Sequence, residues 1–226
     1  MSSIQLKHSG GNGVSIAAPS SNPASNRTLT VPSNADGTIL TSTSGSSLQV
    51  LEQFYLLADG RSVSTSNGTV STTNVTAIQA LTDSFVAATG SSLTYQPPTG
   101  TTELIYEYKF MFDESNANDR YLFSYYLDID GTAILESRGA AYTNGSTYND
   151  YHYFKYGFRI GSGSDSATTG DRASWSSNKT ISLKIARYNS GYSMDLHQVR
   201  YYTPGGSTED FVRRPYVGIT AIGVPS

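Results

Sequence analysis

The clearest pattern in the chain is a strict alternation of apolar and polar positions in five segments of its second half. A period of two places successive side chains on opposite faces of a β-strand, so each segment is expected to bury one face. The predicted core residues are Leu104, Tyr106, Tyr108, Phe110 and Phe112; Tyr121, Phe123, Tyr125, Leu127 and Ile129; His152, Phe154, Tyr156, Phe158 and Ile160; Ile181, Leu183 and Ile185; and Val217, Ile219 and Ala221. Glu107 and Lys109 are expected on the face away from the core.

Turn-forming dipeptides separate the segments. They are Asp59-Gly60, Asn67-Gly68, Asp130-Gly131, Asn144-Gly145 and Ser190-Gly191. Asp130-Gly131 predicts a two-residue hairpin turn with a return through Thr132 to Leu135, because both turn residues tolerate positive φ. Residues 48–57 fit a strand or a short helix about equally, and we favour a strand. Turns at this spacing, without a helical period after residue 60, predict an all-β, antiparallel β-sandwich of jelly-roll type over 46–226.

The first 45 residues have a different character. Their apolar residues come in isolated pairs among Gly, Ser, Asn and Pro, and they are too few for an independent core. We expect residues 1–45 to form an extended attachment arm, and composition alone equally allows a partly disordered tail. The candidate attachment residues are Ile4, Leu6, Val14, Ile16, Leu29 and Val31.

Composition excludes several kinds of chemistry. The chain has no cysteine, so it lacks disulfides, thiolate metal sites and a cysteine nucleophile. A net charge of -3 without a run of Lys or Arg argues against a nucleic-acid partner. We expect neither a signal peptide nor a membrane span, and therefore synthesis and assembly in a cytoplasm.

No residue set predicts catalysis, a metal or a cofactor. The histidines, His8, His152 and His197, have no short ligand spacing, and no GxSxG elbow accompanies the many serines. DIDG at 128–131 is explained by a hairpin turn, and GSGSD at 161–165 is a single copy of a calcium-roll fragment that needs tandem copies. Asp113/Glu114 and Glu209/Asp210 are adjacent carboxylates that point to opposite faces of a strand, so neither pair is a catalytic dyad by itself.

One segment has the composition of a recognition loop. Residues 141–153 read AYTNGSTYNDYHY, and Tyr with Ser, Gly and Asn is typical of adaptable binding surfaces. The alternative is that Tyr is simply a half-buried strand residue in a chain with 17 tyrosines. Trp175 is a further candidate, with a structural plug at a sheet edge as its alternative. The candidate receptor or subunit contacts are Tyr142, Asn144, Tyr148, Asn149, Tyr151 and Trp175.

Several strings of the chain resemble virion structural proteins of marine tailed phages, especially cyanophages. In the arm they are LKHSGGNGVSI and VPSNADGTIL, and in the sandwich they are GSSLTYQPPTGTTELIYEY (90–108), GDRASWSSNKTISLKIARY (170–188), LHQVRYYTPG (196–205) and RPYVGITAIG (214–223). The resemblance covers most of the chain and is weakest at 138–150. No catalytic motif accompanies that family, so the resemblance implies a particle component.

The resemblance implies a non-enzymatic protein on the virion surface. The first hypothesis is a tail-fibre or receptor-binding protein, homotrimeric by analogy with the family, whose partners are other tail proteins and a host surface glycan or protein. The second is a capsid decoration, knob or head-fibre protein whose arm docks on the major capsid protein. The third is a glycan-active depolymerase. Assembly in the host bacterial cytoplasm is expected in each case.

Overall fold

The computed structural model describes residues 3–7, 10, 13–17, 47–114, 121–142 and 149–225. The chain divides into two units, Met1–Leu40 and Thr41–Ser226. In the first unit, β1 (Ser3–Lys7) and β2 (Gly13–Ala17) form an antiparallel pair, with Ile4 opposite Ile16 and Leu6 opposite Val14. These are four of the six candidate attachment residues, and Leu29 and Val31 lie outside the described residues.

The second unit is built from two antiparallel sheets. The β9 sheet contains β3 (Gln49–Leu57), β6 (Gln79–Ala80), β9 (Thr101–Glu114), β13 (Asn149–Arg159), β15 (Met194–Leu196) and β18 (Tyr216–Gly223). The β14 sheet contains β7 (Val86–Ala87), β8 (Leu93–Tyr95), β10 (Leu122–Ile129), β11 (Thr132–Ala133), β12 (Gly139–Tyr142) and β14 (Lys179–Arg187). Two hairpins add β4 (Ser62–Thr65) with β5 (Gly68–Ser71), and β16 (Gln198–Tyr202) with β17 (Thr208–Val212).

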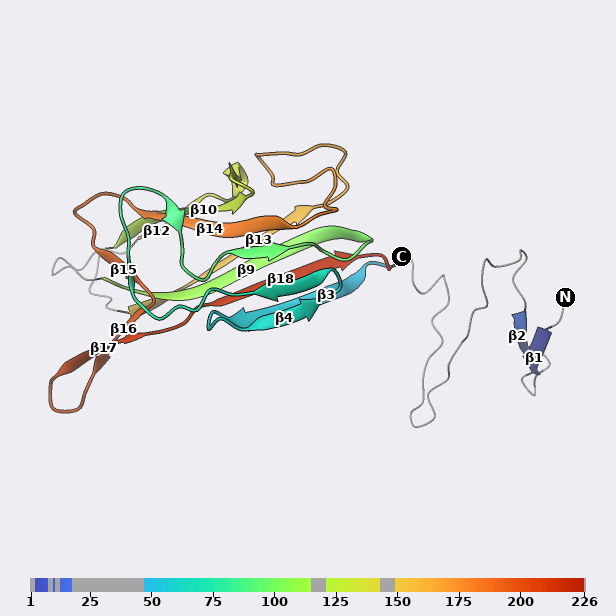
Figure 1. Cartoon of the computed structure of the whole chain (residues 1–226), viewed down its shortest axis with the longest axis horizontal. Coiled ribbons are helices and arrows are strands. Elements are labelled where there is room, and N and C mark those ends of the chain that lie inside the picture. The colour runs from blue at the N-terminus through green and yellow to red at the C-terminus, as the bar shows by residue number, and fades with distance from the viewer. Residues whose placement is uncertain are drawn as a thin grey trace. The chain divides into compact units, whose positions relative to one another are not determined.

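Consecutive long strands alternate between the two sheets. β9 and β13 belong to one sheet and β10 and β14 to the other, so the chain crosses the sandwich at each connection. Figure 1 shows the resulting layers, with β10 and β14 above β9, β18 and β3. This connectivity is typical of jelly-roll-like sandwiches. The predicted all-β antiparallel sandwich is confirmed, and within the described residues the only helix is a 3-10 turn at Leu135–Ser137. None of the described helices is long and apolar enough to cross a membrane.

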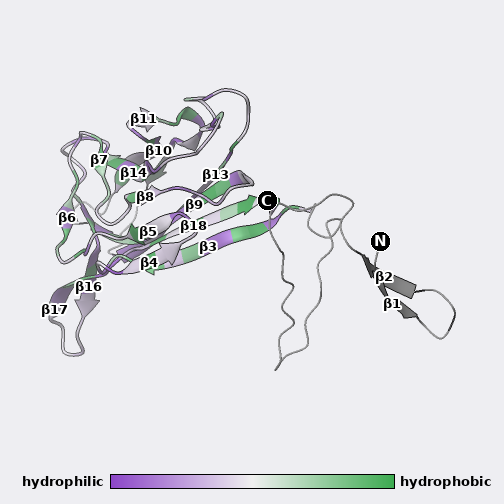
Figure 2. Cartoon of the chain, turned by 45° about the vertical axis from the view of Figure 1, so that its right-hand side comes forward, coloured by the Kyte–Doolittle hydropathy of each residue, from purple (hydrophilic) through white to green (hydrophobic). Residues whose placement is uncertain are grey.

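The core lies between the two sheets and follows the predicted alternation. The inward residues of β9, β14 and β18 are buried, and green hydrophobic stretches recur along the strands in Figure 2. Phe123 of β10 contacts Phe112 and Phe110 of β9 across the sandwich, with ring centroids 5.1 and 6.3 Å apart. Four predicted core residues are only partly buried, namely Tyr125, His152, Tyr156 and Ile160.

Two tyrosines of β9 extend completely into the core. The Tyr106 hydroxyl donates to the Ser91 carbonyl at 2.6 Å, and the Tyr108 hydroxyl donates to the Thr89 carbonyl at 2.8 Å. Burial raises the pKa of both phenols, so both remain neutral donors. Each ring fills apolar space while its hydroxyl satisfies a backbone oxygen beside the β14 sheet.

The turn predictions have mixed outcomes. Asp130 (φ 51°) and Gly131 (φ 80°) form the expected two-residue turn, but the returning strand β11 ends at Ala133. Residues 49–57 form the strand β3 and not a helix. The Asp59-Gly60 turn joins no hairpin, because β3 pairs with β18 and β4 pairs with β5. Asn144-Gly145 lies outside the described residues.

Candidate partner-binding face

The two described histidines are enclosed to different degrees, His197 completely and His152 partly. His152 lies among aromatic rings, 4.8 Å from the Tyr125 ring centroid and 5.5 Å from that of Phe110. His197 is fully buried with φ 69°, and burial lowers its pKa to about 4, partly opposed by the Thr89 backbone. No group of three His, Asp or Glu side chains in the described part of the chain is placed to hold a metal ion.

The carboxylate pairs contribute one member each to an ion network. Arg200 contacts the buried Asp113 at 3.1 Å and Asp210 at 3.4 Å. Asn149 accepts a hydrogen bond from the Arg200 backbone N–H and donates one to its carbonyl, both at 2.7 Å. The ion pairs of Arg200 attach the base of the β16–β17 hairpin to β9, and the two hydrogen bonds of Asn149 attach it to β13. Asn149, a candidate contact residue, therefore has a structural role here.

The other candidate contacts lie in different environments. Tyr142 is 71 % exposed at the end of β12, and Tyr151 is about half exposed on β13. Trp175 is buried, stacks on Phe158 at a centroid distance of 5.7 Å, and donates its indole N–H to the Tyr95 carbonyl at 3.0 Å. Its indole therefore serves mainly the core, which fits the structural alternative named for it. Asn144 and Tyr148 lie outside the described residues.

A row of tyrosines crosses the outer face of the β9 sheet. Tyr55 of β3, Gly218 of β18, Glu107 of β9 and Lys155 of β13 are successive cross-strand neighbours. The hydroxyls of Tyr55 and Tyr153 both donate to the Glu107 carboxylate, and the Lys155 ammonium lies 3.5 Å from it. Glu107 faces away from the core as expected, yet it is only 5 % exposed because these side chains cover it.

Gly218 makes this row possible. A Cβ atom at this position would lie 2.3 Å from Cδ1 and 2.5 Å from Cε1 of the Tyr55 ring. Ordinary carbon contacts are about 3.5–4.0 Å, so only glycine lets the Tyr55 ring lie across β18 and reach Glu107. The hydrogen bond to Glu107, followed by partial burial, raises the pKa of Tyr55. The phenol therefore stays protonated and continues to donate.

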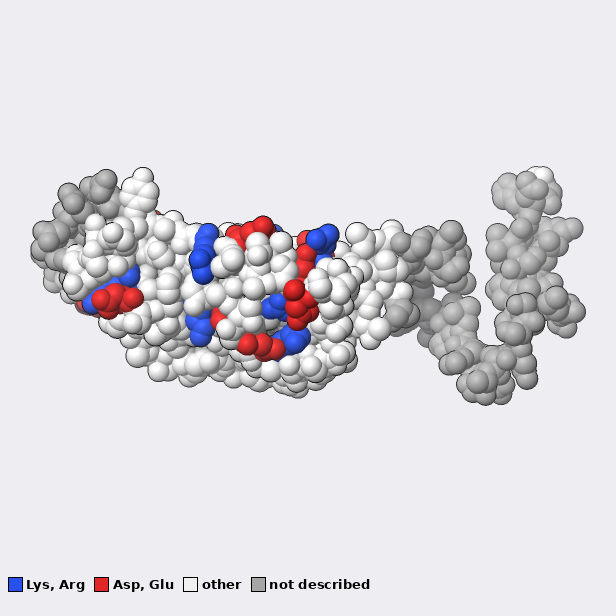
Figure 3. Space-filling view, turned by 90° about the horizontal axis from the view of Figure 1, so that it is seen from above, with Lys and Arg blue, Asp and Glu red and all other residues white. Residues whose placement is uncertain are grey.

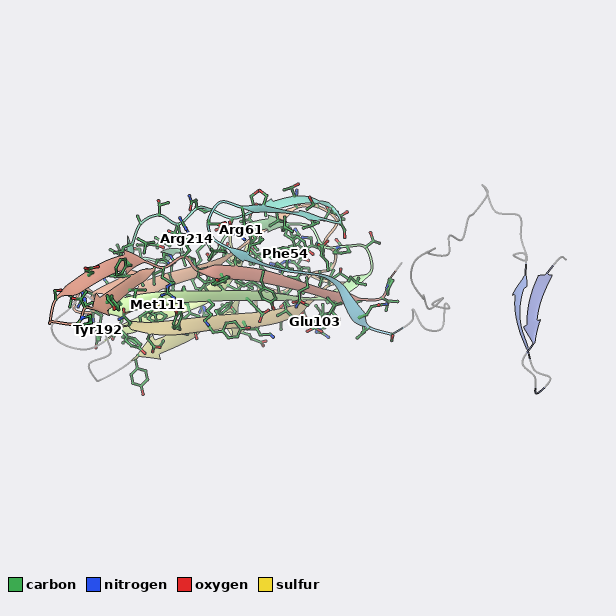
Figure 4. The ribbon with its side chains drawn as sticks, turned by 90° about the horizontal axis from the view of Figure 1, so that it is seen from below. Phe54, Arg61, Glu103, Met111, Tyr192 and Arg214 are labelled. Carbon is green, nitrogen blue, oxygen red and sulfur yellow. The ribbon has the colours of Figure 1, made fainter. Side chains whose placement is uncertain are left out.

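Beside this row the outer face contains a basic hollow of about 320 Å³. Tyr151 is held at its rim, because Arg213 donates to its hydroxyl at 2.8 Å and the Lys109 ammonium lies 4.9 Å from its ring centroid. Arg214 and the half-exposed Tyr216 complete the rim, and the buried Met111 lines the hollow. Figure 4 looks onto this side of the molecule, where β3, β18 and β9 lie foremost, and labels Met111 and Arg214. We call the tyrosine row and this hollow together the tyrosine face.

The opposite side of the sandwich has a different charge arrangement. In Figure 3, which views the molecule from the side opposite to Figure 4, most of the blue atoms lie close to red ones. Elsewhere on the second unit several cations form ion pairs, among them Arg159 with Asp171 at 2.7 Å and Lys179 with Asp130 at 3.4 Å. In the hollow, by contrast, no described carboxylate forms an ion pair with Lys109, Arg213 or Arg214.

The β16–β17 hairpin presents a second exposed aromatic surface. It projects from the sandwich in both Figure 1 and Figure 2, and all five residues of β17 are exposed. Tyr201, Tyr202 and Phe211 are each about half exposed, and the rings of Tyr201 and Phe211 lie 6.3 Å apart. A two-stranded ribbon is only marginally stable by itself, so the Arg200 network at its base matters for its position.

Sequence reasoning found part of the tyrosine face. Tyr151 is a predicted contact and Tyr153 ends the predicted recognition segment 141–153, but Tyr55 and Tyr216 come from β3 and β18, and no short motif links them to that segment. The available signal was a set of tyrosines at outward positions of three strands. Which strands lie side by side depends on the pairing order, which alternation does not determine.

The geometry defines the class of this protein as an antiparallel β-sandwich with an exposed tyrosine face and a separate N-terminal unit. No protein-family model matches the chain, and no curated protein matches it. Similar solved structures include a chain of infectious bursal disease virus, Gt strain, with 14 % identity and a TM-score of 0.34 over 96 % of this chain. This chain spans about half of that one, 48 % of its length.

Two further similar structures come from other viruses. A marine algae virus of the order Picornavirales matches with 13 % identity and a TM-score of 0.19, covering all of this chain and 90 % of the other. Mud Crab Dicistrovirus matches with 8 % identity and a TM-score of 0.21, covering 99 % of this chain and 91 % of the other. These TM-scores are too low to support an argument about fold or function. The fold is therefore assigned from the sheets and the core described above, and the function is argued from the tyrosine face.

Proposed function

We propose that this chain is a non-enzymatic structural component on the surface of a tailed-phage virion, of the tail-fibre or receptor-binding type. The observation that supports this best is the tyrosine face, which holds exposed aromatic side chains in fixed positions on a rigid sheet. Tyrosine gives a large contact area at a small cost in conformational entropy, and it is enriched where proteins bind partners. The resemblance of the sequence to phage virion proteins supports the same reading.

The arrangement of polar groups favours binding over catalysis. Glu107 is engaged by two tyrosines and a lysine, and Asp113 and Asp210 share Arg200. A glycan hydrolase of the usual kind needs two carboxyl groups that flank one bond, with one of them free to donate a proton. These three carboxylates are instead used to position neighbouring side chains.

In this proposal the two units of the chain have different tasks. The N-terminal unit, with its β1–β2 pair, attaches the protein to other virion proteins, and the sandwich is displayed. We also propose that the chain forms a homo-oligomer, and the resemblance to phage virion proteins suggests a trimer. A capsid decoration protein would use the same two parts with a different location on the particle.

Adsorption of the phage to its host tests this function. The purified chain of 226 residues is incubated with host cells before the phage is added, and unadsorbed phage is counted over time. We expect slower adsorption, because the free protein occupies the receptor. Tyr216→Ser, which removes a half-exposed ring from the tyrosine face, should relieve the block, and Tyr188→Ser, on the turn after β14, should not.

Antibody labelling of intact particles in the electron microscope distinguishes a tail-fibre or receptor-binding protein from a capsid decoration protein. Label at the tail, together with slower adsorption, supports the proposal. Label over the capsid with unchanged adsorption would replace it by the decoration protein. Absence of label from particles, in a preparation where the antibody recognises the purified chain, would refute a virion role.

A further inference from the structure

The basic hollow of the tyrosine face has an unusual charge for this protein. The chain has a net charge of -3, yet three cations meet at the hollow without a carboxylate partner among the described residues. Glu107, two residues from Lys109 on β9, already accepts bonds from Tyr55 and Tyr153 and an ion pair from Lys155. Clustered cations repel one another, so the site gains free energy when an anion enters.

The cations are positioned differently. Arg213 is oriented by its bond to the Tyr151 hydroxyl, and Lys109 is held over the Tyr151 ring. The Arg214 side chain forms no hydrogen bond or ion pair with any other described residue, and the residue is exposed. A free guanidinium beside two oriented cations can accept a carboxylate or sulfate in a two-pronged arrangement.

The apolar surfaces at the hollow indicate more than a simple anion. Tyr151 and Tyr216, 47 % and 52 % exposed, offer ring faces, and Met111 adds buried apolar surface. The C–H faces of a sugar ring pack against such aromatic rings, and its hydroxyls can bond to phenols and guanidinium groups. A volume of about 320 Å³ is at the lower end of the range for small-molecule sites, which suits one or two sugar units.

We propose that this hollow binds an acidic saccharide, with Arg214 and Lys109 on its anionic group and Tyr151 and Tyr216 against its ring. The inference rests on the proposed function, since it names the chemical class of the receptor, and it deepens that function. It does not require that the saccharide be cleaved.

Binding of the full-length chain to oligosaccharides of matched length tests the inference. Calorimetric titration with trigalacturonate, which has three carboxylates, is compared with maltotriose, which has none. We expect binding of the acidic sugar alone, with an affinity that falls as salt is added. Arg214→Gln should weaken it about tenfold or more, because a hydrogen bond to a charged group is worth about 1.5–3 kcal/mol and 1.4 kcal/mol is tenfold.

Arg138→Gln is the matched control. Arg138 is likewise exposed and forms no ion pair with a described residue. It lies beside β12 in the other sheet, so its loss should leave the affinity unchanged. Equal affinity of the Arg214→Gln variant and the unmodified chain would overturn the inference. So would undetectable binding of trigalacturonate, or equally tight binding of tripolyphosphate, which has charge without a sugar ring.

The two proposals can fail separately. If the protein labels the tail and slows adsorption but does not bind trigalacturonate, the acidic saccharide is wrong and the receptor-binding function stands. If it binds the sugar through Arg214 but is absent from particles, the site is real and the virion role is wrong.

Discussion

Substituting Gly218 by alanine should disrupt the tyrosine face from beneath. The added methyl group would lie 2.3 Å from the Tyr55 ring and 3.1 Å from the Phe54 carbonyl oxygen. The backbone of β18 cannot withdraw, because it pairs with β3 on one side and with β9 on the other. The half-exposed Tyr55 ring must therefore swing toward solvent and give up its bond to Glu107.

The structure gives an order of magnitude for this change. A hydrogen bond to a charged group contributes about 1.5–3 kcal/mol, and over-packing typically costs about 1–3 kcal/mol. These costs do not add, because moving the ring relieves the over-packing by sacrificing the bond. We expect Gly218→Ala to lower the free energy of unfolding by about 2 kcal/mol.

A double-mutant cycle with Tyr55→Ala isolates the cause. Without the Tyr55 ring only the contact with the Phe54 carbonyl oxygen at 3.1 Å remains, so Gly218→Ala should become close to neutral. Urea unfolding of the four proteins then gives a coupling of about 2 kcal/mol. Gly157→Ala on β13 is the control, because its Cβ would meet its neighbours at 3.5 Å or more. Additivity of the two changes within about 0.5 kcal/mol would refute the reasoning.

Three further predictions concern buried polar groups, each measured by urea unfolding. Arg200→Leu should cost about 3–5 kcal/mol, because it removes the cation beside the buried Asp113 carboxylate. Asp113→Asn in the same chain should recover much of this loss, and a loss below about 1 kcal/mol for Arg200→Leu would contradict the reasoning. Trp175→Phe keeps the stacked ring but removes the indole donor, and should cost about 1–2 kcal/mol. His197 is neutral in the folded chain, where its pKa is lowered to about 4, whereas the unfolded chain takes up the proton near pH 6.5. The free energy of unfolding should therefore fall by about 3 kcal/mol as the pH drops from 6.5 to 4. The variant His197→Asn should lose this pH dependence, and asparagine tolerates the positive φ at this position.

The sandwich was predictable because its core strands have one dry face. Alternation placed Tyr106, Phe123 and Leu183 correctly, since the hydrophobic effect acts on each strand regardless of its partner. Partial burial of His152 and Tyr156 was not predictable. Both lie on β13, which pairs with a single neighbour, β9, so the sheet covers less of them. Position in the sheet, and not the local pattern, determines that exposure.

Most of the tyrosine face could not be predicted from the sequence, because it depends on which strands lie side by side. Alternation assigned Glu107 to the outer face but could not show that Tyr55, 52 residues away, would cover it. The β16–β17 hairpin was missed as well, although Pro204-Gly205-Gly206 is a strong turn signal and both glycines have positive φ. Its two strands carry aromatic residues at positions that face solvent, so they lack the apolar and polar alternation of a core strand.

The tyrosine face is costly to maintain if stability is its only purpose. Glycine inside a strand costs about 0.5–1 kcal/mol relative to alanine, and a carboxylate as buried as Glu107 loses hydration that its three partners must replace. An apolar residue at 107 and a small one at 55 would avoid both costs. The arrangement holds phenol rings in fixed positions, and on the proposed function this reduces the entropy lost when a partner binds. If the proposed receptor-binding function holds, Gly218→Ala should lessen the ability of the purified chain to slow phage adsorption, although it removes no side chain of the face.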